Sequence, residues 1–223
     1  MKLGQGTRLV LIGDSITDCG RRQPVGEGPG ALGNGYVSQV EALLTSVYPD
    51  LGVRVFNLGT SGHTVRDLRA RWQRDVLDLA PDWLSVLIGI NDVWRHFDRP
   101  LAAEAHVSVG EYETTLRELL QQTRQAGVAA GGLVLMTPYY LEPHRGDRMR
   151  AEMDRYGAVV RRLAEEQGAI CVDTQAAFDR VLGHLYPGVL AGDRVHPNLA
   201  GHMVLARAFL TALGFDWART PPA

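Results

Sequence analysis

The sequence predicts a single α/β domain, residues 1–223, in which a parallel sheet carries helices on both faces. Short apolar runs rich in Val, Ile and Leu alternate five times with segments whose apolar residues recur at helical spacing. Continuous apolar runs are typical of strands buried in a parallel sheet, and their alternation with helices indicates repeated βαβ units. A chain of 223 residues, 45% of them hydrophobic, is long enough to bury one large core.

Each predicted strand ends beside small or polar residues, at the edge of the sheet where ligands bind in such folds. We predict five strands, in 8–13, 52–57, 82–89, 132–136 and 169–173. The predicted helices span 36–48, 66–79, 112–127, 149–163, 178–182 and 199–213. Pro49 and Gly127 are typical helix ends, and Asn198 is a typical N-cap. We expect 93–100, after the third strand, to be a loop.

The loop 21–35 contains a G-x-G-x-x-G pattern at Gly28, Gly30 and Gly33. In dinucleotide-binding proteins this pattern directly follows a strand and opens a helix. Here the glycines lie well beyond the predicted strand and Pro29 interrupts them, so we interpret the segment as a rim loop. We expect the protein to need no cofactor.

Ser15 is the candidate nucleophile, because it stands directly after the first strand, in Gly13-Asp14-Ser15. A residue at the carboxyl end of a parallel strand faces the crevice and not the core. A serine in this place can also simply cap a helix or turn the chain. Residues near the other end of the chain favour the catalytic interpretation.

Asp193 and His196 lie three residues apart in one Pro- and Gly-bounded loop, so one turn of chain can present both side chains together. A serine hydroxyl is a weak nucleophile until a histidine takes its proton, and a carboxylate orients that histidine. Ser15, His196 and Asp193 supply these three roles. Taken alone, His196 would be an ordinary surface histidine.

Acyl transfer also needs hydrogen-bond donors for the developing oxyanion. The chain offers the backbone N–H of Ser15, the backbone N–H of Gly62 after the second strand, and the side-chain amide of Asn91 after the third. The alternatives are an ordinary turn glycine at Gly62 and an Asx turn at Asn91.

Four motifs together resemble the blocks of the SGNH (GDSL-type) hydrolase family, in the family's order and over almost the whole chain. They are Gly13-Asp14-Ser15, residues 57–62, Gly89-Ile90-Asn91-Asp92 and Asp193-Arg194-Val195-His196. The resemblance implies a flavodoxin-like, three-layer α/β/α fold, a Ser15-His196-Asp193 triad and an oxyanion hole completed by Gly62 and Asn91. Longer stretches are most similar to the intracellular bacterial acetylxylan esterases of that family, which are homo-oligomers. Gly192 stands where those relatives carry an aromatic residue, so we expect the pocket beside the triad to differ in shape.

The substrate expected from these features is a small acetylated sugar. Aromatic residues follow the third and fourth strands, and flat aromatic side chains suit sugar rings. We expect Asp14, Trp94 and Tyr139 to contact the substrate. Two alternatives remain, a lysophospholipase or thioesterase on the same fold and a non-catalytic carbohydrate- or cofactor-binding module.

Composition argues against several other classes of protein. The net charge of −2 comes from mixed acidic and basic residues, so we expect neither a nucleic-acid nor a membrane partner. The two cysteines are Cys19 and Cys171, and no His, Cys or Asp grouping has a metal-ligand spacing, so we expect free thiols and no metal. We expect Cys171 to be buried in its strand. With no signal-like or membrane-spanning segment, the expected location is the cytoplasm.

The end of the chain predicts self-association. Phe215 and Trp217 follow the last helix, where a monomer would have difficulty covering both aromatic side chains. Large aromatic residues are enriched at interfaces. Together with the family resemblance, this predicts a homo-oligomer.

Overall fold

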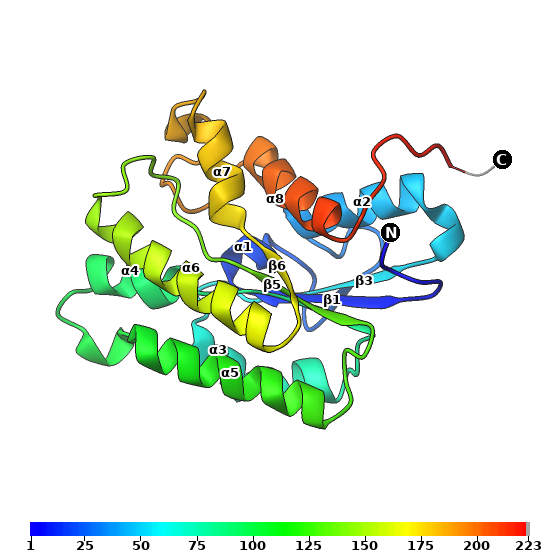
Figure 1. Cartoon of the computed structure of the whole chain (residues 1–223), viewed down its shortest axis with the longest axis horizontal. Coiled ribbons are helices and arrows are strands. Elements are labelled where there is room, and N and C mark those ends of the chain that lie inside the picture. Colours follow the sequence, from blue (N-terminus) through cyan, green and yellow to red (C-terminus); the bar gives the residue numbers. More distant parts are fainter. Residues whose placement is uncertain (222–223) are drawn as a thin grey trace.

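The computed structural model describes residues 1–221, which form a six-stranded sheet in the order β2-β3-β1-β4-β5-β6 (Figure 1). The strands are β1 Arg8–Gly13, β2 Gly26–Glu27, β3 Arg54–Gly59, β4 Trp83–Leu87, β5 Gly132–Met136 and β6 Ile170–Val172. Five of them run parallel, which confirms the predicted parallel sheet. The sixth strand, β2, is not among the five predicted, and it pairs antiparallel with β3. A strand of two residues in a Gly-rich loop has no periodicity that a sequence could reveal.

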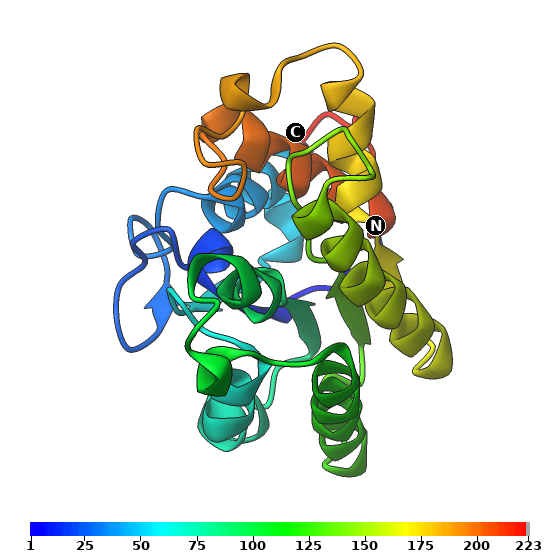
Figure 2. The ribbon, with the colours of Figure 1, turned by 90° about the vertical axis from the view of Figure 1, so that its left-hand side faces the viewer.

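Helices cover both faces of the sheet, as in flavodoxin-like folds. They are α1 Ser15–Asp18, α2 Tyr36–Val47, α3 Val65–Trp72, α4 Ile90–Asp98, α5 Val109–Gln125, α6 Arg148–Glu166, α7 Thr174–Leu182 and α8 Leu199–Ala212. Helices α2, α7 and α8 lie on one face, and α3, α5 and α6 lie on the other (Figures 1 and 2). The predicted three-layer α/β/α architecture is therefore confirmed. Within residues 1–221, no helix combines the length and apolar character needed to cross a membrane.

The segment expected to be a loop at 93–100 is instead mostly helix, because α4 runs from Ile90 to Asp98. Asn91 and Asp92 look like turn residues in the sequence, but both are buried. Asp92 Oδ1 accepts a hydrogen bond from the backbone N–H of Val65 at 3.0 Å, which joins the start of α4 to the start of α3. A tertiary contact of this kind overrides the local turn preference.

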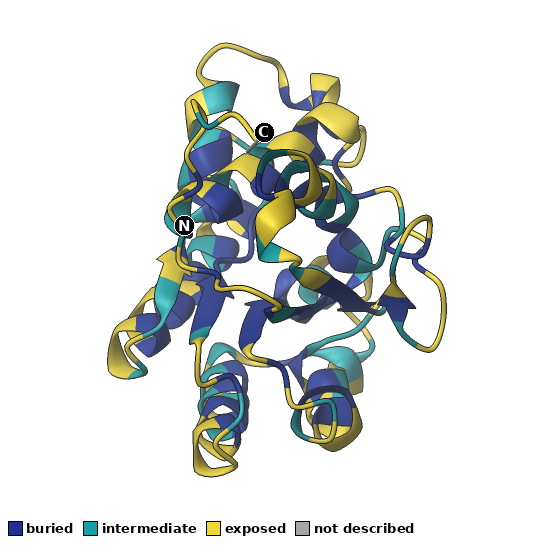
Figure 3. Cartoon of the chain, turned by 90° about the vertical axis from the view of Figure 1, so that its right-hand side faces the viewer, coloured by how far each residue is buried: buried dark blue, intermediate teal, exposed yellow. Residues whose placement is uncertain are grey.

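The central strand β1 is buried on both faces, and Leu9, Val10, Leu11 and Ile12 are all 0% exposed. Figure 3 shows the central strands buried between helices whose outer faces are exposed. Gly13 at the end of β1 pairs with Gly59 of β3 and Leu87 of β4. The loops after these three strands therefore start at one level of the sheet edge.

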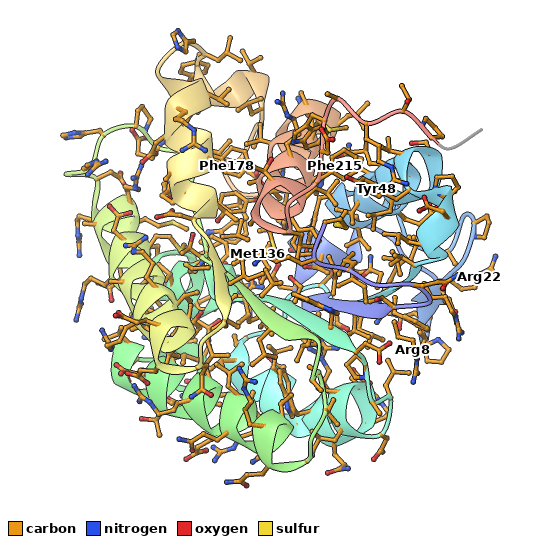
Figure 4. The ribbon with its side chains drawn as sticks, turned by 45° about the vertical axis from the view of Figure 1, so that its right-hand side comes forward. Arg8, Arg22, Tyr48, Met136, Phe178 and Phe215 are labelled. Atoms are coloured by element: carbon orange, nitrogen blue, oxygen red, sulfur yellow. The ribbon has the colours of Figure 1, made fainter. Side chains whose placement is uncertain are left out.

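The prediction that Cys171 is buried is wrong, and of the two tail aromatics expected to be hard to cover, one is buried and one is not. Cys171 is exposed, because β6 is an edge strand of three residues with a single strand neighbour. Phe215 is buried against Tyr48, with ring centroids 5.1 Å apart (Figure 4). Of the two tail aromatics, only Trp217 remains on the surface, 43% exposed.

Candidate active site

Ser15 lies where β1 ends and α1 begins. A Cβ on Gly13 would clash with the backbone oxygen of Leu87, so glycine allows β1 and β4 to end this close together. The side chain of Asp14 caps α1 by accepting the backbone N–H of Ile16 at 3.0 Å. These contacts hold Ser15 at the sheet edge.

The structure brings Ser15, His196 and Asp193 into one hydrogen-bonded chain. Ser15 Oγ lies 2.8 Å from Nε2 of His196, and Nδ1 of His196 lies 2.6 Å from Oδ2 of Asp193. An ionised carboxylate can only accept, so Nδ1 carries the proton and donates it to Asp193. Nε2 is then the nitrogen that can accept the proton of the serine hydroxyl.

Asp193 is held in its ionised form. Partial burial would raise the pKa of this carboxyl. Hydrogen bonds from the His196 ring, from the backbone N–H of His196 and from that of Val195 outweigh burial and hold the pKa of Asp193 below its usual range. The two backbone bonds both reach Oδ1, at 2.8 and 2.9 Å, and leave Oδ2 for the ring.

Tyr139 is buried beneath the loop that carries Asp193 and His196, where its ring is out of reach of a substrate. Its side chain is 0% exposed, and its hydroxyl donates to the backbone oxygen of Val195 at 3.2 Å. Arg194 in the same loop pairs with Glu142 at 2.6 Å. The prediction that Tyr139 contacts substrate is wrong, because the sequence shows which loop it lies in but not which way its ring points. The neighbouring Tyr140 is the partly exposed one.

The three predicted oxyanion donors follow three adjacent strands. Gly62 lies in a turn after β3 with φ of 82°, a conformation that favours glycine. Ser61 in this turn donates through both its backbone N–H and its hydroxyl to Asp18 of α1, at 3.1 and 2.8 Å. Asn91 is 2% exposed, and its Nδ2 donates to the backbone oxygen of His63 at 3.0 Å. Asn91 and the glycine turn are therefore joined directly.

Asp14, predicted to contact substrate, is instead buried at 1% exposure. Its Oδ1 caps α1, and its Oδ2 has no hydrogen-bond partner among residues 1–221. Burial raises the pKa of Asp14 to about 7, and burial likewise raises the pKa of Asp92 to about 7. The prediction for Asp14 is wrong because the side chain of the residue before Ser15 turns back to cap the helix that starts there.

A pocket of about 360 Å³ adjoins the triad on one side. Its lining residues are Trp94, Phe97, Asp98, Tyr140, Asp147, Arg148 and Met149. The indole of Trp94 lies 5.9 Å from the His196 ring between centroids, which connects this pocket to the triad. Of these residues Trp94 was predicted from the sequence, whereas Asp147 and Arg148, at the start of α6, carry no pattern that distinguishes them from the residues of any other helix start. A cavity of about 510 Å³ lies elsewhere, between β6, α7 and α8.

This arrangement defines a class of enzyme. A serine hydroxyl hydrogen-bonded to a histidine, a carboxylate on the other ring nitrogen and amide donors at the same sheet edge are the parts of a serine hydrolase. Among residues 1–221 no group of three or more His, Cys, Asp or Glu side chains is placed to hold a metal ion.

Comparison with known proteins places the chain within this class. The model of the GDSL-like lipase/acylhydrolase family matches residues 11–204, so the chain belongs to this family and is a carboxylic ester hydrolase. It is 58% identical over 221 residues to an acetylxylan esterase of Geobacillus stearothermophilus, an alignment that covers 99% of this chain and 100% of that protein.

Solved structures agree with the sequence comparison. The crystal structure of Axe2, an acetylxylan esterase from Geobacillus stearothermophilus, superposes with a TM-score of 0.95 at 58% identity, covering 98% of this chain and 99% of that one. Other structures of Axe2 are of catalytic mutants, with a serine, a histidine or an aspartate replaced by alanine. An α/β hydrolase from the metagenome of Lake Arreo gives a TM-score of 0.92 at 52% identity, covering 96% of this chain and 98% of that one.

Proposed function

We propose that this chain removes acetyl groups from short acetylated xylo-oligosaccharides, by way of an acyl-enzyme on Ser15. The observation that carries the proposal is the bonded chain from Ser15 Oγ through His196 to Asp193. Similarity to an acetylxylan esterase supports the choice of acetylated xylose units as substrate.

In this proposal the reaction takes two similar steps. Ser15 Oγ attacks the ester carbonyl while Nε2 of His196 takes the hydroxyl proton, and ionised Asp193 stabilises the resulting imidazolium. The backbone N–H groups of Ser15 and Gly62 and the Nδ2 of Asn91 donate to the oxyanion of the tetrahedral intermediate. Nε2 returns the proton to the departing sugar hydroxyl, and a water molecule then repeats the sequence on the acetyl-enzyme.

The pocket beside Trp94 suits a sugar better than an acyl chain. It combines aromatic faces with the charged groups of Asp98, Asp147 and Arg148, which can bond sugar hydroxyls. A longer acyl chain would need a continuous apolar lining to gain the roughly 0.8 kcal/mol that each buried methylene provides. We therefore expect acetyl esters to be the best substrates.

The test compares acyl length and alcohol separately. We expect kcat/KM to fall steeply from acetyl to butyryl to octanoyl esters, and acetylated xylo-oligosaccharides to be deacetylated. Trp94→Ala should lower kcat/KM on the sugar acetate more than on a small aryl acetate, since only the sugar reaches this wall. Leu101→Ala is the matched control, because Leu101 follows α4 but is 98% exposed. Octanoyl esters as best substrates would favour a lipase or thioesterase, and binding of sugar without hydrolysis would favour a carbohydrate-binding module.

We also propose that the protein forms a homo-oligomer. Several large apolar side chains remain exposed, among them Tyr186 at 76%, Leu199 at 72% and Trp217 at 43%. Burying such side chains against a second copy is favourable. Sedimentation at the monomer mass of 24.4 kDa across micromolar concentrations would contradict this proposal.

A further inference from the structure

Arg95 lies one helical turn after the oxyanion donor Asn91 on α4, and it contacts that donor directly. Its Nη2 donates to Asn91 Oδ1 at 3.0 Å. Its Nη1 donates to Asp98, and its guanidinium carbon lies 5.5 Å from the centre of the Trp94 ring. The side chain is only 18% exposed. An arginine held on three sides in this way has a fixed orientation.

The contact with Arg95 determines which way the Asn91 amide faces. A side-chain amide has an oxygen that accepts and a nitrogen that donates, and a rotation of half a turn exchanges them. Arg95 can only donate, so it requires the amide oxygen. The backbone oxygen of His63, 3.0 Å from Nδ2, can only accept, so it requires the amide nitrogen. Both partners select the orientation in which Nδ2 is on the side of the glycine turn.

We propose that Arg95 is a positioning residue that fixes and polarises the Asn91 amide as a donor to the oxyanion; this inference rests on the proposed serine esterase mechanism. Nδ2 has two hydrogens, and one is used by His63, so the second remains for the oxyanion. A cationic donor at Oδ1 draws electron density from the amide and makes that N–H a stronger donor. In the opposite orientation Oδ1 would face the oxyanion and repel it.

Other roles for Arg95 predict different results. As a surface ion pair with Asp98 three residues away, it would contribute little to stability and nothing specific to catalysis. As part of the Trp94 wall, it would act on the sugar and leave aryl acetates unaffected. A positioning role predicts an equal loss of kcat with both kinds of ester, because both form the same oxyanion.

The experiment measures kcat and KM of Arg95→Met, Arg95→Lys and the control Arg99→Met. Arg99 is exposed and follows directly after α4. We expect Arg95→Met to lower kcat about tenfold on both aryl acetate and acetylated xylo-oligosaccharide, less than the roughly 10²–10³ lost when an oxyanion donor is removed. KM should change by less than about twofold, because the lost interaction strengthens in the transition state. Arg95→Lys, which keeps a cation without the planar fork, should fall between wild type and Arg95→Met.

A double-mutant cycle with Asn91→Ala separates positioning from a merely structural role. Once the Asn91 amide is removed, replacing Arg95 by Met or by Lys should lower kcat little further. The inference would be overturned if substituting Arg95 lowered kcat as much in the Asn91→Ala background as in the wild type. It would also be overturned if kcat fell only with the sugar ester, or if Arg95→Met had a normal kcat. If Arg95→Met does not fold, the lysine variant is put through the same cycle. A wild-type enzyme without esterase activity would instead contradict the proposed function.

Discussion

Replacing Asp193 by Asn should lower the esterase activity more than replacing it by Ala. Oδ1 of Asp193 accepts two backbone N–H groups, from Val195 and His196. An asparagine in this place keeps its oxygen on those donors, so its NH₂ faces Nδ1 of His196. Nδ1 must then accept, and the ring proton moves to Nε2. A histidine with its proton on Nε2 cannot accept the hydroxyl proton of Ser15.

The size of the effect follows from this tautomer argument. In serine proteases the same change costs about 10⁴ in kcat. We expect a similar loss for Asp193→Asn, which corresponds to about 5 kcal/mol in activation free energy. The Asp193 side chain is 41% exposed, so in Asp193→Ala a water molecule can take the place of the carboxylate and accept from Nδ1. The alanine variant should therefore retain more activity than the asparagine variant.

The assay is kcat/KM with an aryl acetate for both variants and the wild type. Thermal unfolding of each variant is the control, because alanine also removes the acceptor of the two backbone N–H groups in the loop. An asparagine variant within about tenfold of wild type, or one more active than the alanine variant, would refute the tautomer argument.

Two further predictions concern stability. Burial raises the pKa of the Asp14 carboxyl from 3.8 to about 7, so the folded protein binds the carboxyl proton more tightly than the unfolded chain does. The contribution of this proton to the free energy of unfolding is therefore full below about pH 4 and is lost as the pH rises through about 7. Asp14→Asn, which keeps an acceptor for the N–H of Ile16, should show a smaller fall in unfolding free energy over that window by urea titration, and an unchanged slope would contradict this. Arg71, whose ion pair with Asp75 is buried at 7% exposure for both side chains, also donates to backbone oxygens at the ends of β1 and β3. Arg71→Met should lower the free energy of unfolding by about 3–5 kcal/mol. Arg74, whose side chain is 74% exposed, is the control, and Arg74→Met should lower it by less than about 1 kcal/mol. Similar losses for the two variants would disprove the argument.

The triad could be predicted from the sequence because its signals are local. Ser15 directly follows a strand, and Asp193 and His196 are three residues apart, so spacing alone places each near a partner. The edge of a parallel sheet then brings both segments together without any knowledge of packing. The same reasoning placed Gly62 and Asn91 at this edge of the sheet, after β3 and β4, the two strands that flank β1.

What the sequence could not show was the direction in which side chains point. Asp14 and Tyr139 lie in the predicted segments, yet both side chains turn inward, one to cap α1 and one to hold the triad loop. The helix at Ile90–Asp98 was missed for a related reason, since its first turn is stabilised by a bond from Asp92 to α3 and not by local propensity. Without that helix, the turn that joins Arg95 to Asn91 could not be recognised.

The central claim is that Ser15 is the nucleophile, and covalent labelling tests it most directly. The protein is inactivated with a fluorophosphonate, and the site of the adduct is located by mass spectrometry while the remaining esterase activity is measured. We predict one adduct per chain, on Ser15, with activity lost in proportion to labelling and no adduct on Ser15→Ala. An adduct on another residue that accounts for the inactivation, or full activity after complete labelling of Ser15, would contradict the account.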